Sequence, residues 1–318
     1  MSTVFAQAKR PEQAGAPAPA PRSLVRTVLG ETPTAWLYVL PAVIIIIGLA
    51  VVPVGWSALL SVQDKDPIAE TTSYVGLENY RDLFDDPVFA EAVENTLVYA
   101  ALFVPLSVLG GLGLALALNR RIRLIGFYRT LAFVPVVVSA TVQGVLFSFI
   151  FDDQFGVANA LLTNAGLPTQ PFFADGDQAL LLLVVAALWA GTSCVSFCAI
   201  VLLAALQDVP RELAEAASID GARRGGVFRH VTLPAIAPVL GFLLLWQTIQ
   251  AVQLFDLIYG STAGGPGQST YVVVYYVYRE IRDVAYGTGA AASYVVAGSL
   301  MALTALAAIV RARRGRVA

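Results

Sequence analysis

Long apolar runs constrain the fold of this chain more than any other feature. Six of them occur, at about residues 35–62, 96–118, 130–151, 179–206, 236–259 and 288–310. A helix needs about 20 predominantly apolar residues to cross the hydrocarbon core of a bilayer. Within that core only a helix or a closed barrel satisfies the backbone polar groups. The sequence therefore predicts an all-α polytopic membrane protein with six transmembrane helices.

The composition excludes a water-soluble globular domain. Charged residues make up only 13% of the chain, whereas soluble domains carry about 25%. The mean hydropathy of +0.71 points the same way.

The basic residues are distributed unevenly along the chain. Of the 20 Lys and Arg residues, 16 fall in the N-terminal tail, the connections between runs two and three and between runs four and five, and the C-terminus. Basic residues concentrate in cytoplasmic loops. The sequence therefore predicts that both termini and the 208–238 connection are cytoplasmic.

The predicted domain organisation has three parts. Residues 1–34 are expected to be a disordered cytoplasmic tail, because they are rich in Pro and Ala and contain no apolar stretch typical of a signal peptide. Residues 35–310 are expected to form the six-helix membrane domain, which contains the 208–238 loop. Residues 311–318 are expected to be a basic cytoplasmic tail.

The 208–238 loop is polar and rich in helix formers, although it separates two apolar runs. Pro210 and the acidic residues that follow it predict a helix start. Gly221 can adopt a positive φ and end that helix. A second, basic helical piece is expected next, punctuated by Pro234 and Pro238. Two short helices joined at a glycine form a rigid projection that is suited to docking into a partner's groove.

The same loop carries a family resemblance. Glu215-Ala216-Ala217, then Gly221 and, after nine intervening residues, Val231-Thr232-Leu233-Pro234 resemble the EAA loop of permease subunits of bacterial ABC importers, which usually have Ile at the position of Val231. In that family the loop forms a coupling helix that inserts into a cleft of a separate ATPase subunit. The coupling residues implied here are Glu212, Glu215, Ala216, Ala217, Asp220, Gly221, Arg224, Leu233 and Pro234. An ordinary cytoplasmic amphipathic linker is the alternative.

Weaker motifs spread the resemblance over nearly the whole chain from Trp36 onward. Gly76-Leu77-Glu78-Asn79-Tyr80, Asn95-Thr96, Phe127-Tyr128-Arg129-Thr130 with Pro135, Gly156-Val157-Ala158-Asn159 and Gly264-Gly265-Pro266 are similar to the carbohydrate-importer branch, which includes maltose-type and glycerol-3-phosphate-type systems.

That resemblance implies a type I importer permease in a bacterial cell membrane. The implied partners are a second, commonly non-identical permease, a dimeric ATPase that holds ATP and Mg, an extracytoplasmic solute-binding protein and a small sugar-like substrate. Nucleic acid is not an expected partner. ATP binding would close the ATPase pair and switch the permeases from an inward-facing to an outward-facing state.

The fifth apolar run contains an unusual series of polar residues. Gln247, Gln250, Gln253 and Asp256 recur every three residues, which on one helix forms a slanting polar stripe. Polar side chains inside a span usually face the bundle interior or a water-filled path. Amides, a carboxylate and aromatic rings suit a polyhydroxylated ligand. The substrate-path candidates are Gln247, Gln250, Gln253, Phe255, Asp256 and Tyr259, and by resemblance Gln253, Phe255 and Asp256 fall in the region that can line the sugar site. Hydrogen bonding between helices is the alternative role.

Other polar or small residues in the spans are second-rank candidates. For the serines and threonines, packing or local backbone bonding is the alternative to a place in the path. Gly110, Gly111 and Gly113 favour a close helix approach over ligand binding. The polar candidates in the third and fourth runs are Ser139, Thr141, Gln143, Thr192, Ser193 and Ser196.

The sequence does not predict an enzyme. It contains no G-x-x-x-x-G-K-[ST] phosphate-binding loop, so ATP hydrolysis would belong to a partner. The single histidine, His230, has no metal-ligand cluster around it, and no metal site is predicted. Cys194 and Cys198 are interpreted as small buried residues on one helix face. Two alternatives remain: an ion-coupled secondary transporter, with Asp256 as the candidate intramembrane carboxylate, and a membrane-embedded enzyme.

Overall fold

The computed structural model describes residues 33–66, 71–120, 123–189 and 194–315. The chain divides into two units, one ending at Gly55 and one beginning at Trp56. The first unit holds α2 (Pro33–Ile46), a π-helical turn (Ile47–Val51) and the beginning of α3 (Val52–Leu60), which together form one uninterrupted helix. The first predicted span is confirmed as a helix long enough to cross a membrane.

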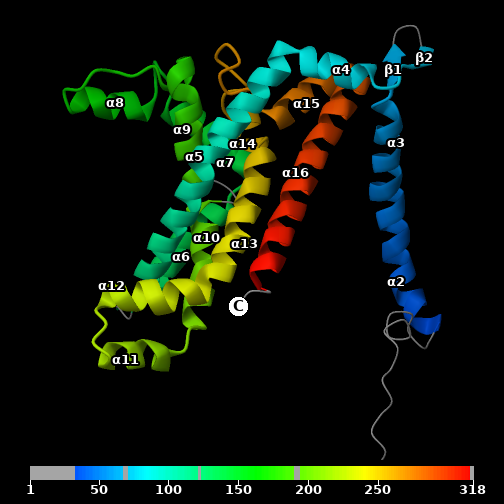
Figure 1. Ribbon diagram of the computed structural model, residues 1–318. Helices are drawn as coiled ribbons and strands as arrows, with labels where there is room; N and C mark the ends of the chain where they lie inside the picture. Colours follow the sequence, from blue (N-terminus) through cyan, green and yellow to red (C-terminus); the bar gives the residue numbers. More distant parts are fainter. Residues whose placement is uncertain (1–32, 67–70, 121–122, 190–193, 316–318) are drawn as a thin grey trace, which may run out of the picture. The chain divides into compact units, whose positions relative to one another are not determined.

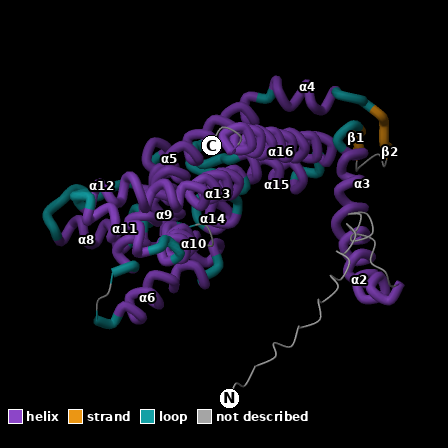
Figure 2. The backbone as a smooth tube through the Cα atoms, turned by 60° about the horizontal axis from the view of Figure 1, so that its bottom comes forward, coloured by secondary structure: helices purple, strands orange, loops and turns teal. Residues whose placement is uncertain are grey.

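The second unit begins with a feature that the sequence did not predict. Strands β1 (Gln63–Asp66) and β2 (Thr71–Tyr74) form an antiparallel hairpin in which Gln63 pairs with Tyr74. Figure 2 shows these strands in orange, and helices account for most of the remaining described chain. The short helix α4 (Glu78–Asp85) follows the hairpin.

Helix α5 (Pro87–Leu118) begins nine residues before the second predicted span. Asp86 caps it, because its carboxylate accepts a hydrogen bond from the Val88 N–H at 2.8 Å, and Pro87 occupies the first helical position. The polar residues between 87 and 95 are therefore the first turns of the helix.

The third and fourth predicted spans are each built from two helices. Helices α6 (Ile125–Val137) and α7 (Ala140–Ile150) are bent by 95° at Val138–Ser139. The buried Gln143 amide donates to the Pro135 carbonyl at 2.9 Å and satisfies a backbone group at the corner. The fourth run contains α9 (Gly176–Trp189) and α10 (Val195–Gln207). Thr192 and Ser193 lie outside the described residues. Between the third and fourth runs lie α8 (Val157–Asn164) and a 3-10 turn (Phe172–Ala174).

The fifth predicted span is wrong at both of its ends. Helix α11 (Arg211–Ile219) is separate, but α12 (Arg224–Val227), a π-helical segment (Phe228–Thr232) and α13 (Leu233–Val252) run on as one helix of 29 residues. Pro234 and Pro238 lie inside this continuous helix without ending it, and Pro234 follows directly after the π-helical segment that ends at Thr232. At the other end the helix stops at Val252, and a separate turn, α14 (Asp256–Gly260), follows.

The last two helices are α15 (Val273–Arg282) and α16 (Tyr286–Gly315). Helix α16 continues five residues beyond position 310, so the beginning of the predicted C-terminal tail is helical. Residues 1–32 and 316–318 lie outside the described residues, and the remainder of the predicted domain boundaries stays a prediction.

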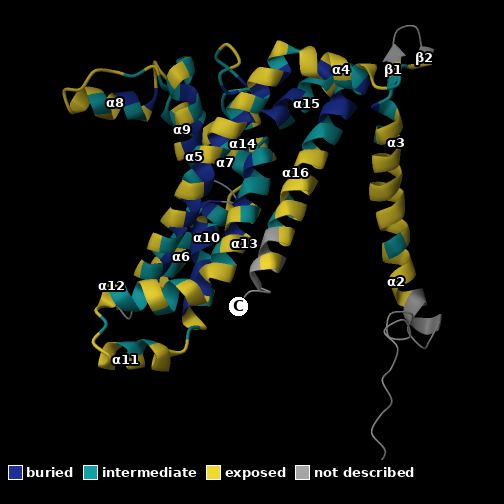
Figure 3. Ribbon diagram, viewed as in Figure 1, coloured by how far each residue is buried: buried dark blue, intermediate teal, exposed yellow. Residues whose placement is uncertain are grey.

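Helices α5 and α10 approach each other closely at the centre of the second unit. A Cβ atom added to Gly111 would lie 2.3 Å from the Cys198 Cβ, so only glycine fits there. The predicted role of Gly111 is thereby confirmed, whereas Gly110 only borders Val195 and Gly113 faces open space. Both cysteines are buried, and Figure 3 shows the buried residues of α5 and α10 in blue between the exposed faces of the bundle.

Four of the described helices are long and apolar enough to cross a membrane, or five segments if α6 and α7 count as one span. Helices α9 and α10 are apolar but shorter. The all-α membrane fold is confirmed, while the count of six spans stays a prediction. Figure 1 shows α11 and α12 at one end of the α5, α10 and α13 group and α4 and α15 at the opposite end.

Candidate functional site

The turn after α11 is a complete Schellman motif. Gly221 has a φ of +87°, its N–H donates to the Ser218 carbonyl at 3.1 Å, and the Ala222 N–H donates to the Ala217 carbonyl at 2.9 Å. These two bonds satisfy the last carbonyls of the helix. The predicted turn at Gly221 is confirmed, and the positive φ explains why the position needs glycine.

Helix α11 presents an outward face that this chain leaves uncovered. Leu213 is 53% exposed and Ile219 is 86% exposed, and Glu212, Glu215 and Ala216 are exposed between them. The half-buried Ala214 and Ala217 are on the other face. Apolar side chains flanked by carboxylates on a short, well-capped helix are suited to insertion into a groove.

The charged residues of this loop also form no ion pair with any described residue. Among the described residues the one ion pair is Arg279–Asp283, on α15. Asp220 and Arg224 are exposed at the turn, and Leu233 and Pro234 lie where the second helical piece becomes α13. Six of the nine predicted coupling residues therefore lie on α11 and its C-terminal turn, which form one projection, whereas Arg224, Leu233 and Pro234 lie on the helix that follows. The projection is joined directly to the 29-residue helix from Arg224 to Val252, hereafter the long helix.

The predicted polar stripe at the other end of the long helix is only partly formed. Gln247 is fully buried and its amide donates to the Ser107 hydroxyl of α5 at 2.9 Å, which is a bond between helices. Gln250 is half-buried. Because α13 ends at Val252, Gln253 caps it and Asp256 begins α14, and both are exposed. The assumption of one continuous helix was wrong, so the four residues do not form one stripe.

An aromatic cluster lies where the long helix ends. Phe255 stacks on Tyr259 at 5.4 Å between ring centroids and lies 5.2 Å from the ring of Tyr278. Tyr259 is also 5.6 Å from Tyr278 and is 47% exposed, so one side of the cluster is open. Tyr275 completes the group at 5.8 Å from Tyr278. Aromatic rings with an exposed amide and carboxylate beside them offer the groups that bind polyhydroxylated ligands.

Sequence reasoning missed the two tyrosines contributed by α15. Tyr271, Tyr275 and Tyr278 follow the spacing i, i+4 and i+7, which places them on one helix face. That spacing could have identified an aromatic face. It could not have shown that the face packs on residues 255–259.

The loop before α15 is fastened to α5 by two residues of the Asn-Thr motif. The Asn95 amide donates to the carbonyls of Gln268 at 3.0 Å and Tyr271 at 3.1 Å. The Thr96 hydroxyl accepts a hydrogen bond from the Val273 N–H at 3.0 Å. These bonds join segments more than 170 residues apart, and they fix the position of the aromatic face.

A second contact ties α15 to the start of α5. The Tyr276 hydroxyl donates to Asp86 Oδ2 at 2.7 Å, while Asp86 Oδ1 caps α5. Burial and this hydrogen bond raise the pKa of the Tyr276 phenol. Burial, together with the nearby carboxylates of Asp86 and Asp283, raises the pKa of Glu280 on the same helix.

The second-rank candidates have mainly structural positions. Ser139 lies at the corner between α6 and α7, and Gln143 bonds across it. The Thr141 backbone lies against Gly260, where an added Cβ would meet the Thr141 carbonyl oxygen at 2.4 Å. Ser196 is buried beside an apolar cavity. None of these four is placed in the aromatic cluster.

No group of His, Cys, Asp and Glu residues that could hold a metal ion occurs among the described residues. His230 is exposed, and its Nδ1 lies 3.0 Å from the Gly226 carbonyl one helical turn earlier. The surface role predicted for His230 agrees with this position.

Comparison with known proteins was made over both sequence and structure. The family described as "binding-protein-dependent transport system inner membrane component" matches residues 107–315. A permease protein of the sn-glycerol-3-phosphate transport system from Pectobacterium atrosepticum is 35% identical over 256 residues, which are 80% of this chain and 85% of that protein. A sulfoquinovosyl glycerol transport permease from Agrobacterium fabrum is 32% identical over 87% of this chain and 90% of its own length.

Solved structures show the same fold. A bacterial ABC transporter involved in the import of the acidic polysaccharide alginate matches with a TM-score of 0.78 at 23% sequence identity, over 88% of this chain and 95% of the matched chain. The residues matched by the family and by these relatives cover most of the described membrane domain. The chain therefore belongs to the binding-protein-dependent transport system inner membrane components, as a multi-pass, non-catalytic permease subunit of an ABC importer.

Proposed function

We propose that this permease forms half of the translocation path of an ATP-driven importer for a sugar or a related polyol or glycerol phosphate. The two relatives described above are named for sn-glycerol-3-phosphate and for sulfoquinovosyl glycerol, which share a polyhydroxylated skeleton. The observation that carries the proposal is the long helix, which joins a docking projection at one end to the aromatic cluster at the other.

The coupling partner in this proposal is a separate, dimeric ATPase subunit that binds ATP and Mg. Helix α11 would insert into a groove of that subunit, with Leu213 and Ile219 buried on docking and Glu215 at the rim. The exposure of these side chains and the absence of ionic partners for the loop within the described residues support this role. When nucleotide closes the ATPase pair, the projection would move and carry the long helix with it.

The solute would pass the opposite end of the long helix. Gln253 and Asp256 are exposed beside the rings of Phe255 and Tyr259, and they would bind solute hydroxyl groups while the rings stack on the sugar face. Gln247 has a different role, since it bonds α13 to α5. These contacts therefore support a place in the solute path for residues 253–259. Gln247 instead bonds two helices together.

The remaining partners follow from the arrangement of the importer. A second permease, expected to be a different chain, would supply the other half of the path, and a binding protein would deliver the solute from outside. A solved structure of the alginate transporter is a complex with a pentasaccharide-bound periplasmic protein. The distribution of basic residues supports an orientation with both termini and the α11 projection in the cytoplasm, where an ATPase can reach them.

The test separates an ATP-driven importer from an ion-coupled secondary transporter. Uptake of labelled glycerol phosphate and labelled maltose would be measured in cells depleted of ATP while the proton gradient is maintained, and in cells with ATP present after the gradient is collapsed. We expect uptake to stop in the first case and to persist in the second. Uptake that follows the proton gradient and survives ATP depletion would contradict the proposal.

A further inference from the structure

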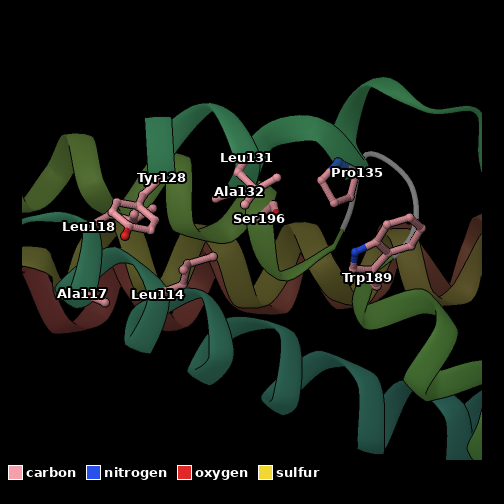
Figure 4. A pocket seen from close by; sticks show the side chains of 9 residues that line it. All are labelled: Leu114, Ala117, Leu118, Tyr128, Leu131, Ala132, Pro135, Trp189 and Ser196. Carbon is pink, nitrogen blue, oxygen red and sulfur yellow. The ribbon is translucent and has the colours of Figure 1, made fainter. Parts of the chain in front are cut away.

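An elongated apolar cavity of about 440 Å³ lies between α5, α6 and α10, and the proposed solute path does not use it. Figure 4 shows Leu118 and Tyr128 at one end of the row of lining residues and Pro135 and Trp189 at the other, with Ala132 between them. Tyr128 and Pro135 are seven residues apart on one helix, which is about 10 Å along its axis. The cavity is therefore a slot along α6.

The slot is suited to an apolar chain and not to a sugar. Leucine, alanine and proline side chains form most of its walls, and the side-chain hydroxyls it offers are those of Tyr128 and Ser196. A polyhydroxylated solute would need several well-placed polar groups. Its walls are mostly apolar, so burial of a hydrocarbon chain there is favourable.

Arginines gather at the Leu118–Tyr128 end of the slot. Arg129 donates from Nη2 to the Leu118 carbonyl at 3.1 Å, and its Nε is buried without a hydrogen-bond partner in the described part of the chain. Arg120 and Arg123 lie in the turn between α5 and α6, and both are exposed.

No carboxylate of the α5–α6 connection offsets the positive charge of this corner. The sequence contains no Asp or Glu between positions 94 and 152, and none of the three arginines forms an ion pair with a described residue. An unpaired buried N–H donor costs free energy until an acceptor reaches it. Guanidinium groups bind phosphate through charge-assisted hydrogen bonds.

We propose that this corner binds one anionic phospholipid of the cytoplasmic leaflet. Its phosphate lies on the arginines, and one acyl chain lies in the slot beside α6. Basic pockets between transmembrane helices on the cytoplasmic side are known to hold anionic headgroups. The cytoplasmic placement of the corner rests on the orientation given under the proposed function.

The experiment measures lipid binding to the full chain purified in its assembled importer. Dioleoylphosphatidylglycerol and dioleoylphosphatidylcholine are titrated separately and followed by native mass spectrometry. We expect the anionic lipid to bind the wild-type chain at least tenfold more tightly. Each arginine near the surface contributes about fivefold to such binding, so the double variant Arg120→Gln/Arg123→Gln should remove most of the preference.

Two further variants distinguish binding of the lipid headgroup from binding of the acyl chain. Arg313→Gln makes the same charge change at an exposed position on α16, away from the slot, and should keep the preference. Ala132→Phe fills the slot and should weaken both lipids while the preference for the anionic one persists. Equal binding of the two lipids by the wild-type chain, or equal losses in the Arg120→Gln/Arg123→Gln and Arg313→Gln variants, would overturn the lipid site.

Other occupants of the slot give their own signatures. If added sugar protects the cysteine of Ala132→Cys from labelling, the slot binds the solute. If that cysteine crosslinks to the second permease, the slot is a subunit interface. Either result overturns the lipid site. Labelling of the cysteine of Arg123→Cys by a reagent added outside the cell would instead overturn the proposed membrane orientation. This measurement does not depend on lipid affinity.

Discussion

The two ends of the long helix are built in opposite ways. At the α11 end, the Schellman bonds join residues five positions apart or fewer, and the outward face is exposed. At the aromatic end, the contacts come from α5, α14 and α15, and Asn95 and Asp86 reach across more than 170 positions. A docking element has to be rigid on its own while its partner is away. A solute path has to be held by the surrounding bundle.

This difference predicts which property a substitution at each end should impair. Changes at the α11 end should break coupling and leave the membrane core intact, because little of the core depends on it. Changes at the aromatic end should alter the handling of solute, or the core itself, and leave docking intact. The predictions below test this separation.

The largest effect is expected for Gly221→Pro. Proline is fixed near a φ of −65°, whereas this position has +87°. The variant therefore cannot adopt the native turn, and a loss of about 3 kcal/mol in docking would lower coupled uptake about a hundredfold. Uptake and co-purification with the ATPase would be measured together. Glu215→Lys, which reverses a charge at the rim, should act in the same direction.

Gly241→Ala is the matched control for Gly221→Pro. It lies on α13 with an ordinary φ and open space around it, and it should leave both measurements unchanged. Normal uptake and normal co-purification in Gly221→Pro and Glu215→Lys would defeat the docking role of the loop.

A smaller effect is expected at the aromatic end. Gln253→Ala or Asp256→Ala should raise the solute KM about tenfold, because each removes a hydrogen bond worth about 1–1.5 kcal/mol. ATPase docking should be unchanged. Solute concentration series in proteoliposomes provide the measurement.

Gln247→Ala is the instructive comparison within the same series. It removes the amide that donates to the Ser107 hydroxyl, so the bond between α13 and α5 is lost and this hydroxyl keeps only its own bond to the Val104 carbonyl. We therefore expect a lower melting temperature with little change in KM. If Gln247→Ala changes KM as strongly as Gln253→Ala while stability is unaffected, the division of roles between the two glutamines is wrong.

The smallest effect concerns pH. Burial and neighbouring carboxylates raise the pKa of Glu280 above the ordinary 4.5. The folded state therefore holds its proton more tightly than the unfolded chain. The stability that the protonated Glu280 carboxyl contributes is present at pH below 4.5 and is lost as pH rises through the raised pKa. Glu280→Gln should stabilise the protein progressively as pH rises through that window, as measured by melting temperature from pH 4 to 7. Glu94→Gln, an exposed carboxylate on α5, should show no such trend.

Most of the α11 projection could be predicted, because its geometry is local. Gly221 ends the helix through its own φ, and the residues that bond across the turn are its neighbours in the sequence. The family resemblance was carried by the same residues. The one error was to expect Pro234 and Pro238 to separate the second helical piece from α13, although both lie within one continuous helix.

Predictions failed where tertiary contacts decide the structure. Apolar periodicity could not show the 95° bend between α6 and α7, because the Gln143 bond to Pro135 that stabilises it joins two separate helices. The sequence also gives no signal that the long helix ends at Val252, since Gln253 and Phe255 would both be acceptable within a helix. The predicted stripe of glutamines was wrong in its geometry, because α13 ends at Val252.

The unbroken backbone from Arg224 to Val252 fixes an angle as well as a length. Each added residue in an α-helix turns everything beyond it by about 100° and advances it by about 1.5 Å. A single-residue insertion would thus rotate the α11 end relative to the end at Val252, even though every side chain at both ends remained unchanged. We therefore expect an insertion in this helix to disturb the relation between its two ends more than a substitution that keeps the residue count.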